Sequence, residues 1–468
     1  MAVRFSEEQV LQATRGTRVR IGARASYGAV CTDTRALSPG CLFVALRGER
    51  FDGHDFLFQA AEGGAAGVVV EQGRARKDPG PDVAVYEVAD PLVALGALGR
   101  AHRERFKCPI GAITGSNGKT TTKELFAAIL ETRGPALRTH GNLNNEIGVP
   151  LTLFGLEPRH VAAAVEMGMN HAGEIGRLAR IARPDAGLIT IVQPAHLEFL
   201  GTIDGVARAK GELFEALEPG ATAVVNLDDE RVVAQAGRAG PQVKRLTYGR
   251  AANADVRLVK VEPQGRDGLQ LTVRFQGQDH GVALNLIGDH NATNATGAFA
   301  LALALGYTPT ECVRGLEAAQ AHARRLQVLE GKGGVTVIDD CYNANPASMI
   351  AALDALSGLA VESRAVGVLG DMLELGPDEH ELHRQIGLRA SDQCALVAFF
   401  GPRMAHAHAE AKKKLGERAR HFTEVEPMLA WLEASVRQGD VVLVKGSRGM
   451  RLERAVDALT GRASGGGH

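Results

Sequence analysis

A glycine-bearing turn that ends in Gly118, Lys119 and Thr120 carries the clearest chemical signal in the sequence. An apolar run at 109–113 leads into it, and a helix-forming run at 123–130 follows. Turn N–H groups, the positive end of a helix and a lysine ammonium together bind phosphates, and the threonine hydroxyl binds Mg²⁺. The general pattern has a glycine where Ile113 stands, so a glycine turn without a ligand is the alternative. We predict a nucleotide triphosphate site at Gly115, Ser116, Asn117, Gly118, Lys119, Thr120 and Thr121.

Three further side chains have types that suit a metal ion near this turn. Glu166 ends an apolar run at 161–165, and a carboxylate at the end of a buried strand suits Mg²⁺, with a helix cap or surface acid as the alternative. His196 follows another apolar run, and a structural histidine is its alternative. Lys210 falls on the apolar stripe of a predicted helix near 204–217, where an ammonium must reach solvent, pair or lose its charge. Simple snorkelling to solvent and a metal-binding lysine carbamate both remain open there.

Polar clusters follow other turns and strands. Asn142, Asn144 and Asn145 share one glycine turn, where they stabilise the turn or present amides to a substrate. Residues 339–346 join paired acids to amides after a buried strand, and residues 445–448 hold the equivalent place after another. A phosphate or carboxylate partner suits the latter segment. Since open α/β sheets bind ligands at the carboxyl ends of their strands, we expect these clusters to line ligand sites.

The elements that position these residues alternate between strand and helix, which predicts α/β architecture with mostly parallel sheets. At 468 residues the chain is long enough for two or three domains. We predict a small α/β domain at 1–106, a P-loop domain at 107–318 and a doubly wound, Rossmann-like domain at 319–468. Alternating strand-like runs within 253–287 predict an antiparallel extension of the central sheet.

Composition narrows the class of protein. Hydrophobic residues make up 45% and charged residues 23%, as in ordinary globular proteins. A formal net charge of −1 argues against a broad nucleic-acid or membrane surface. The six scattered cysteines form no C-x-x-C pair and fit a reducing cytosol. Acidic residues near the start and the lack of a long apolar run predict no signal peptide and no membrane insertion, and therefore a cytoplasmic protein.

Taken together, these motifs resemble the Mur ligases nearly from end to end. The residues that carry the resemblance are 32–35, 114–120, 141–150, 166–170, 340–346, 370–376 and 445–448. The resemblance implies three domains, for a UDP-sugar substrate, for ATP and for the incoming amine. It also implies ATP-dependent joining of D-alanyl-D-alanine to UDP-N-acetylmuramoyl-tripeptide through an acyl phosphate, by a protein that we expect to be a monomer.

Residue roles follow from the resemblance in the same way. Lys119 is expected on the phosphates, Thr120 and Glu166 on one Mg²⁺, and His196 with a carbamylated Lys210 on a second. The other implied residues are His290, Asn291 and Asn294 on ATP, with Asn294 near the adenine, Arg325 and Asp340 over the nucleotide, Thr34, Arg35 and 43–46 on the UDP group, and Asn142, Asn144, Asn145, Asn343, Asn345 and Lys445 on the other substrates.

Three positions depart from the family pattern. Arg324 stands where a Gly-Arg pair is usual, which predicts a stiffer hinge; Ile191 replaces an asparagine, and Cys341 replaces a serine. Two other functions compete with the one above. A sibling ligase would add a single amino acid to a different acceptor. A nucleotide-binding switch or scaffold would bind ATP without turnover, and the many inward polar residues argue against it.

Overall fold

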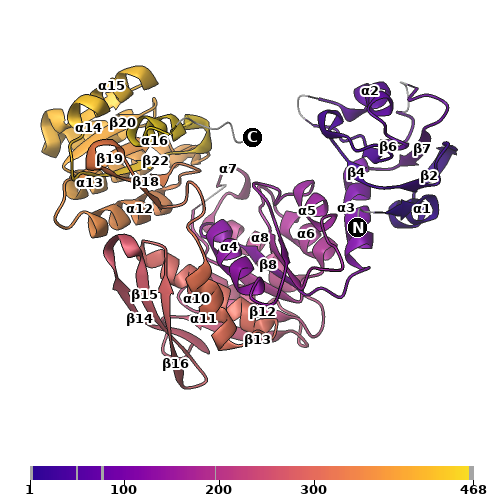
Figure 1. Cartoon of the computed structure of the whole chain (residues 1–468), viewed down its shortest axis with the longest axis horizontal. Helices are drawn as coiled ribbons and strands as arrows, with labels where there is room; N and C mark the ends of the chain where they lie inside the picture. Colours follow the sequence, from indigo (N-terminus) through magenta and orange to yellow (C-terminus); the bar gives the residue numbers. More distant parts are fainter. Residues whose placement is uncertain (1–3, 49–50, 75–77, 195–196, 463–468) are drawn as a thin grey trace.

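Three large sheets, one for each of three α/β domains, form the framework of the described chain, as the sequence predicts (Figure 1). The computed structural model describes residues 4–48, 51–74, 78–194 and 197–462. The first and last domains lie on opposite sides of the central one (Figure 1). Within the described ranges, no helix is both long and apolar enough to cross a bilayer.

The first domain holds a five-stranded sheet of order β2-β7-β6-β5-β4, in which only β2 runs antiparallel to its neighbour. A separate antiparallel pair, β1 with β3, lies outside it. The elements are β1 (Phe5–Ser6), α1 (Glu7–Thr14), β2 (Thr17–Arg20), β3 (Ser26–Tyr27), β4 (Val30–Cys31), η1 (Thr34–Ala36), β5 (Leu42–Val44), η2 (Gly53–Phe56), α2 (Leu57–Glu62), β6 (Gly67–Glu71), β7 (Ala84–Val88) and α3 (Pro91–Arg103).

The central domain is a nine-stranded sheet of order β16-β15-β14-β13-β12-β11-β8-β10-β9. The strands from β9 to β14 pair in parallel, and the hairpin strands β15 and β16 extend the sheet antiparallel, which confirms the predicted extension. The elements are β8 (Ile110–Thr114), α4 (Lys119–Leu130), β9 (Ala136–Arg138), α5 (Gly148–Leu153), β10 (Ala162–Glu166), α6 (Glu174–Ala182), β11 (Ala186–Ile189), α7 (Leu197–Leu200), α8 (Ile203–Glu215), β12 (Thr222–Asn226), α9 (Glu230–Ala236), β13 (Lys244–Gly249), β14 (Val256–Pro263), η3 (Gly265–Asp267), β15 (Leu269–Phe275), β16 (Gln278–Leu284), α10 (Asp289–Ala304) and α11 (Pro309–Ala318).

The third domain has a six-stranded sheet of order β17-β18-β22-β19-β20-β21, with β17 as its antiparallel edge. The elements are β17 (Gln327–Glu330), η4 (Lys332–Gly334), β18 (Thr336–Asp340), α12 (Pro346–Leu359), β19 (Ala365–Gly370), η5 (Gly376–Asp378), α13 (Glu379–Gln393), β20 (Leu396–Phe400), α14 (Ala405–Leu415), η6 (Gly416–Arg418), β21 (Ala419–Phe422), α15 (Val425–Ser435), β22 (Val441–Lys445), η7 (Arg448–Met450) and α16 (Glu453–Thr460).

The inner strands β8, β10, β11 and β12 are buried on both faces, because their residues alternate between two hydrophobic clusters. In β10, Ala162 and Ala164 pack into one cluster, whereas Ala163 and Val165 pack into the other. This explains why the sequence shows continuous apolar runs rather than alternation. A polar residue can therefore appear only where such a strand ends, and Glu166 is the last residue of β10.

The linker between the second and third domains holds its backbone in an unusual conformation. Arg324 has φ 63° and Leu326 has φ 50°, both in the left-handed region that non-glycine residues seldom adopt. Arg325, between them, reaches back to the central domain. The linker therefore bends sharply at a position where the chain has no glycine to relieve it.

Candidate active site

The glycine turn between β8 and α4 adopts the conformation that a phosphate loop needs. Gly118 caps α4 with φ 79°, and a Cβ there would lie 2.3 Å from Oδ1 of Asn294. Gly115 has φ 150°, and a Cβ there would lie 1.8 Å from Oγ1 of Thr190. Both positions therefore require glycine for conformation and for space. The helix directs its free N–H groups at this turn.

Lys119 begins α4 and folds back over the turn. Its Nζ donates to the Gly115 carbonyl oxygen at 2.8 Å. Burial lowers the pKa of Lys119, while the nearby Glu166 carboxylate acts in the opposite direction. A bound phosphate would supply the counter-charge that this ammonium lacks, so the turn is suited to an anionic ligand.

Glu166 lies beside the turn, because β10 and β8 are adjacent and Glu166 pairs with Ile113 in register. Its side chain is 2% exposed. One carboxylate oxygen, Oε1, accepts from Nδ2 of Asn144 at 2.7 Å. The other, Oε2, is buried and has no hydrogen-bond partner among the described residues. A buried carboxylate oxygen without a donor is what a hard cation such as Mg²⁺ would occupy.

Lys210 lies on α8, is 2% exposed, and lines the same cavity as Lys119 and Glu166. Its pKa is held well below the usual range, because burial penalises the ammonium and Lys119 repels it. Burial therefore favours the neutral form of the amine, which is the form that reacts with carbon dioxide. His196, the fourth predicted metal residue, lies outside the described residues.

The third domain closes the far side of the cavity with two strand ends that lie next to each other. Asp340 ends β18 and Lys445 ends β22, and the two residues are paired in register. Lys445 Nζ donates to Oδ2 of Asp340 at 2.6 Å and to the carbonyl oxygen of Asn343 at 2.9 Å. The Leu326 N–H donates to Oδ1 of Asp340 at 3.2 Å, so this carboxylate also fixes the linker.

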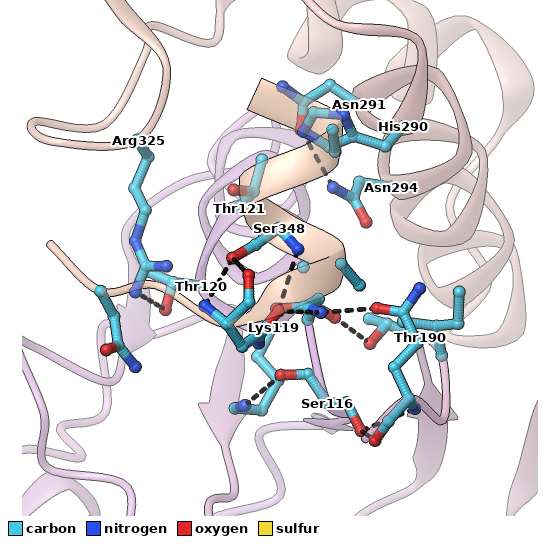
Figure 2. Close-up of a pocket in the computed structure, with 18 of the residues that line it drawn as sticks. Ser116, Lys119, Thr120, Thr121, Thr190, His290, Asn291, Asn294, Arg325 and Ser348 are labelled. Atoms are coloured by element: carbon cyan, nitrogen blue, oxygen red, sulfur yellow. Dashed lines mark hydrogen bonds between the residues drawn. The ribbon is translucent and has the colours of Figure 1, made fainter. Parts of the chain in front are cut away.

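Two polar contacts join the P-loop to the third domain. Asn117 and Asn345 exchange amide hydrogen bonds, at 2.8 Å from Nδ2 of Asn345 and 3.2 Å from Nδ2 of Asn117. Arg325 stacks over the Tyr342 ring with its Cζ 4.2 Å from the centroid, and its Nη2 donates to Oγ1 of Thr120 at 3.4 Å (Figure 2). The site is therefore assembled from both domains.

The cavity between the two domains has a volume of about 530 Å³. Figure 2 shows His290, Asn291 and Asn294 of α10 on one side of it and Arg325 on another. Of the residues predicted from sequence, those that line it are Ser116, Asn117, Gly118, Lys119, Thr120, Thr121, Asn144, Glu166, Lys210, His290, Asn291, Asn294, Arg325, Asp340, Asn343, Asn345 and Lys445.

Some predicted residues lie elsewhere. The oxygen Oδ1 of Asn145 accepts from the N–H groups of Ile147 and Gly148 at the start of α5, which is a helix-capping role. Asn142 is exposed. Neither is among the residues that line the cavity. Thr34 and Arg35 lie in the first domain, where the 88% exposed Arg35 side chain pairs with Asp33.

Other lining residues were not singled out from the sequence. Asn226 ends β12, and Thr190 directly follows β11, so both obey the strand-end rule that identified Glu166. Asp228 and Arg250 also line the cavity; Asp228 accepts from the Arg250 N–H at 2.8 Å. Gln193 accepts from Nδ2 of Asn117 and extends the amide pair. No local sequence signal marks Gln193, because its role depends on the facing loop.

A P-loop that faces the strand ends of a second α/β domain defines a multidomain nucleotide-dependent enzyme. Comparison with known families makes the class specific. Three family models match successive parts of the chain: "Mur ligase family, catalytic domain" at 26–103, "Mur ligase middle domain" at 113–302, and "Mur ligase, glutamate ligase domain" at 324–448.

Individual relatives agree over almost the whole chain. The UDP-N-acetylmuramoyl-tripeptide–D-alanyl-D-alanine ligase of Bacillus subtilis is 37% identical over 92% of both chains, and that of Escherichia coli is 37% identical over 94% of this chain and 95% of its own. A crystal structure of MurF from Acinetobacter baumannii superposes with a TM-score of 0.88 at 32% identity, over 98% of this chain and 100% of its own. The structure of MurF from Thermotoga maritima in complex with ADP superposes with a TM-score of 0.79 at 27% identity, over 92% of this chain and 96% of its own. The chain belongs to the Mur ligase family.

Proposed function

We propose that this protein joins D-alanyl-D-alanine to UDP-N-acetylmuramoyl-tripeptide with hydrolysis of ATP to ADP and phosphate. The observation that carries the proposal is the cavity itself, with a P-loop on one wall and the strand-end residues Asp340 and Lys445 on the other. Relatives that bear the name of this activity match more than nine-tenths of the chain at 37% identity.

The proposed reaction has two steps. A carboxylate oxygen of the tripeptide attacks the γ-phosphorus of ATP, so that ADP leaves and an acyl phosphate forms. The dipeptide amine then attacks the acyl carbon, and the tetrahedral intermediate expels phosphate and loses a proton to give the amide. The first step brings two anions together, which the Lys119 ammonium and the Arg325 guanidinium would offset.

We propose that Thr120 and Glu166 hold one Mg²⁺, and that His196 and a carbamylated Lys210 hold a second. Support comes from the unpartnered Oε2 of Glu166 and from the burial of Lys210. Mg²⁺ neutralises phosphate charge and polarises the transferred phosphoryl group when bound. A site built from few carboxylates suits this ion, which usually keeps waters and substrate phosphates as its remaining ligands.

The other predicted roles extend the proposal to all three substrates. His290, Asn291 and Asn294 would face the adenine, since all three line the cavity beside the glycine turn. Thr34, Arg35 and the segment 43–46 would bind the UDP group in a first domain of residues 1–106. Asn142, Asn144, Asn145, Asn343, Asn345 and Lys445 would contact the tripeptide or the dipeptide. ATP and a nucleotide-linked substrate imply work in the cytoplasm, and we propose a monomer.

The test is phosphate release from ATP with the UDP-linked tripeptide, with and without D-alanyl-D-alanine, followed by product mass. We expect release only with both, and a mass gain of one dipeptide less one water. Lys119→Ala should abolish release, whereas Lys412→Ala, on an exposed lysine of α14, should leave it unchanged. Equal release with a single amino acid would favour a sibling ligase, and nucleotide binding without release under any acceptor would refute the proposal.

A further inference from the structure

Lys123 is a buried cation that the reaction proposed above does not use. It lies on α4, four residues after Lys119, and its side chain is 1% exposed. Its Nζ donates to the Thr139 carbonyl oxygen at 2.7 Å and lies 2.6 Å from Oε1 of Glu124. Burying an ammonium is costly unless each of its contacts is satisfied, and an apolar side chain of similar length would fill the same space. The charge at this position therefore needs a reason.

Thr139, which receives the hydrogen bond from Lys123, holds the end of the strand that carries Glu166. Thr139 follows β9 and is fully buried. Its N–H donates to the Ala164 carbonyl oxygen at 3.0 Å, and its Oγ1 accepts from the Glu166 N–H at 3.0 Å. One residue thus fixes two alternate positions at the end of β10, the second of which is Glu166.

The same loop also reaches the Glu166 carboxylate. It runs from Thr139 to Asn144, whose Nδ2 donates to Oε1 of Glu166 at 2.7 Å. The Asn144 carbonyl oxygen accepts from the Gly168 N–H at 2.8 Å, just beyond the strand. Glu166 is therefore held at its backbone by the start of the loop and at its carboxylate by the end. Lys123 ties the start of this loop to the P-loop helix.

We propose that Lys123 is a positioning residue for the metal-binding carboxylate: through the Thr139 carbonyl it fixes the backbone of Glu166 and the direction of the free Oε2. The proposal rests on the proposed role of Glu166 as a metal ligand. Partners that orient metal ligands are commonly worth 10- to 100-fold in metal affinity. Glu124 supplies a counter-charge to this ammonium, and it also lies 3.5 Å from Nη1 of Arg138.

The experiment measures Mn²⁺ binding to the ADP complex, with free Mn²⁺ detected by its EPR signal. We expect Lys123→Met to weaken Mn²⁺ at least about 10-fold, with Lys123→Arg restoring part of the affinity. Thr139→Val, which removes the hydroxyl but keeps the carbonyl, should weaken it as well, whereas Thr139→Ser should not. In the double variant Lys123→Met/Thr139→Val the two losses should not add, because both act on the same contact to Glu166.

Arg103→Met is the matched control. Arg103 is likewise a buried cation that donates to backbone carbonyl oxygens, those of Ala182 and Phe106, at the junction of the first two domains. It should lose stability and keep the wild-type Mn²⁺ affinity. If Lys123→Met also kept that affinity, or if Arg103→Met lost it equally, the positioning role would be refuted.

Glu166→Gln separates this inference from the function on which it rests. Weaker Mn²⁺ binding by Glu166→Gln together with unchanged binding by Lys123→Met refutes only the role of Lys123. Unchanged binding by Glu166→Gln would remove Glu166 as a metal ligand and both proposals about the metal with it. Should Lys123→Met not fold, Lys123→Arg decides the question, since it keeps the charge but is expected to bind Mn²⁺ more weakly than the wild type; wild-type affinity in Lys123→Arg would then refute the positioning role.

Discussion

The buried amine of Lys210 combines a low pKa with a position beside Glu166. A neutral amine adds to carbon dioxide and releases a proton, which leaves an anionic carbamate. Such a carbamate would place a negative charge near Lys119, where a protonated amine would be repelled. It would also supply an oxygen ligand where the described residues offer few carboxylates.

The corresponding prediction concerns Lys210→Ala. We expect loss of at least about 10-fold in activity, because a metal ligand disappears. Acetate or formate should restore part of it by filling the vacated space with a carboxylate. The check is turnover of the variant against carboxylate concentration, together with a ¹³C signal from labelled bicarbonate on the wild type alone. Absence of both the rescue and the signal would contradict the carbamate.

Cys31 is the most reactive thiol that the structure indicates. The Cys41 thiol donates a hydrogen bond to it and lowers the pKa of Cys31 to about 6, while burial raises the pKa of Cys312. The pair therefore favours the thiolate, the nucleophilic form, on Cys31, whose side chain is also the less buried of the two.

We predict that iodoacetamide at pH 7 modifies Cys31 before the five other cysteines, all of which are buried. Cys41→Ala should slow the reaction roughly tenfold, because the thiol pKa returns toward its usual value of about 8.5. Peptide mass spectrometry after timed labelling measures both rates. Equal labelling of Cys31 in the two proteins would contradict the prediction.

At the scale of single residues, the sequence was most informative where a polar side chain ends a buried strand. Glu166, Asp340 and Lys445 were identified in this way, and all three line the cavity. It was least informative for amides in turns. Asn144 lines the cavity whereas the neighbouring Asn145 caps a helix, and only the path of the folded loop separates the two.

Among the elements, the linker at 324–326 places two left-handed non-glycine residues within three positions, and five more such residues lie elsewhere in the described chain. Its two left-handed residues are not glycine, and each such residue costs about 1–2 kcal/mol. The sequence marked Arg324 as a departure from the family's glycine. The structure adds that the arginine nevertheless adopts a positive φ.

We predict that Arg324→Gly raises stability by up to about 1 kcal/mol, since relief of strain exceeds the entropy that glycine loses on folding. Arg324→Val should lower stability by at least about 1 kcal/mol, because a β-branched residue tolerates positive φ least. Midpoints of urea unfolding for the three proteins measure the order. A higher urea midpoint for Arg324→Val than for the wild type would show that the linker is not held in this conformation in solution.

Most helices and strands can be predicted from apolar runs and from the turn-forming residues, such as glycine and proline, that bound them. From their apolar runs, the sequence predicts strands at 222–226, 365–369 and 441–445, and these agree with β12, β19 and β22 within a residue. It also predicts a helix at 56–65, and the observed α2 is shorter because a 3-10 turn precedes it and Gly63 ends it. β9 and β13 were not predicted. The first is three residues long and half-buried, and the second begins with Lys244 and Arg245, so neither has an apolar run.

At the scale of the whole molecule, the Asn117–Asn345 amide pair is a direct bond between the ATP loop and the third domain. Asn345 also caps α12 through Oδ1, which accepts from the Ser348 N–H. Asn345→Asp keeps that capping oxygen but removes the amide that donates to Asn117. We expect a larger radius of gyration in solution scattering at low nucleotide concentration, with a normal melting temperature. An unchanged radius would mean that other contacts hold the two domains together.

We expect the stability of the junction between the first two domains to depend on pH through His102. This residue of α3 is 3% exposed, and its Nε2 lies 3.2 Å from the Leu156 carbonyl oxygen of the central domain. Burial lowers the pKa of His102, so the unfolded chain takes up a proton that the folded chain does not. Stability should therefore fall as pH drops through about 6.5. His102→Gln should show a smaller fall between pH 7 and 5 in urea unfolding; equal falls would contradict this role.

The cavity between the second and third domains has a consequence for how its ligands act. One stretch of chain joins the two domains, and the polar contacts between them in the described residues include the amide pair, the Arg325 contact and a hydrogen bond from Arg266 to Thr336. If the stretch were cut, the halves would form a weak heterodimer, and ATP bound between them would act as a molecular glue. The factor by which the nucleotide tightens the two halves would then equal the factor by which joining the halves tightens the nucleotide.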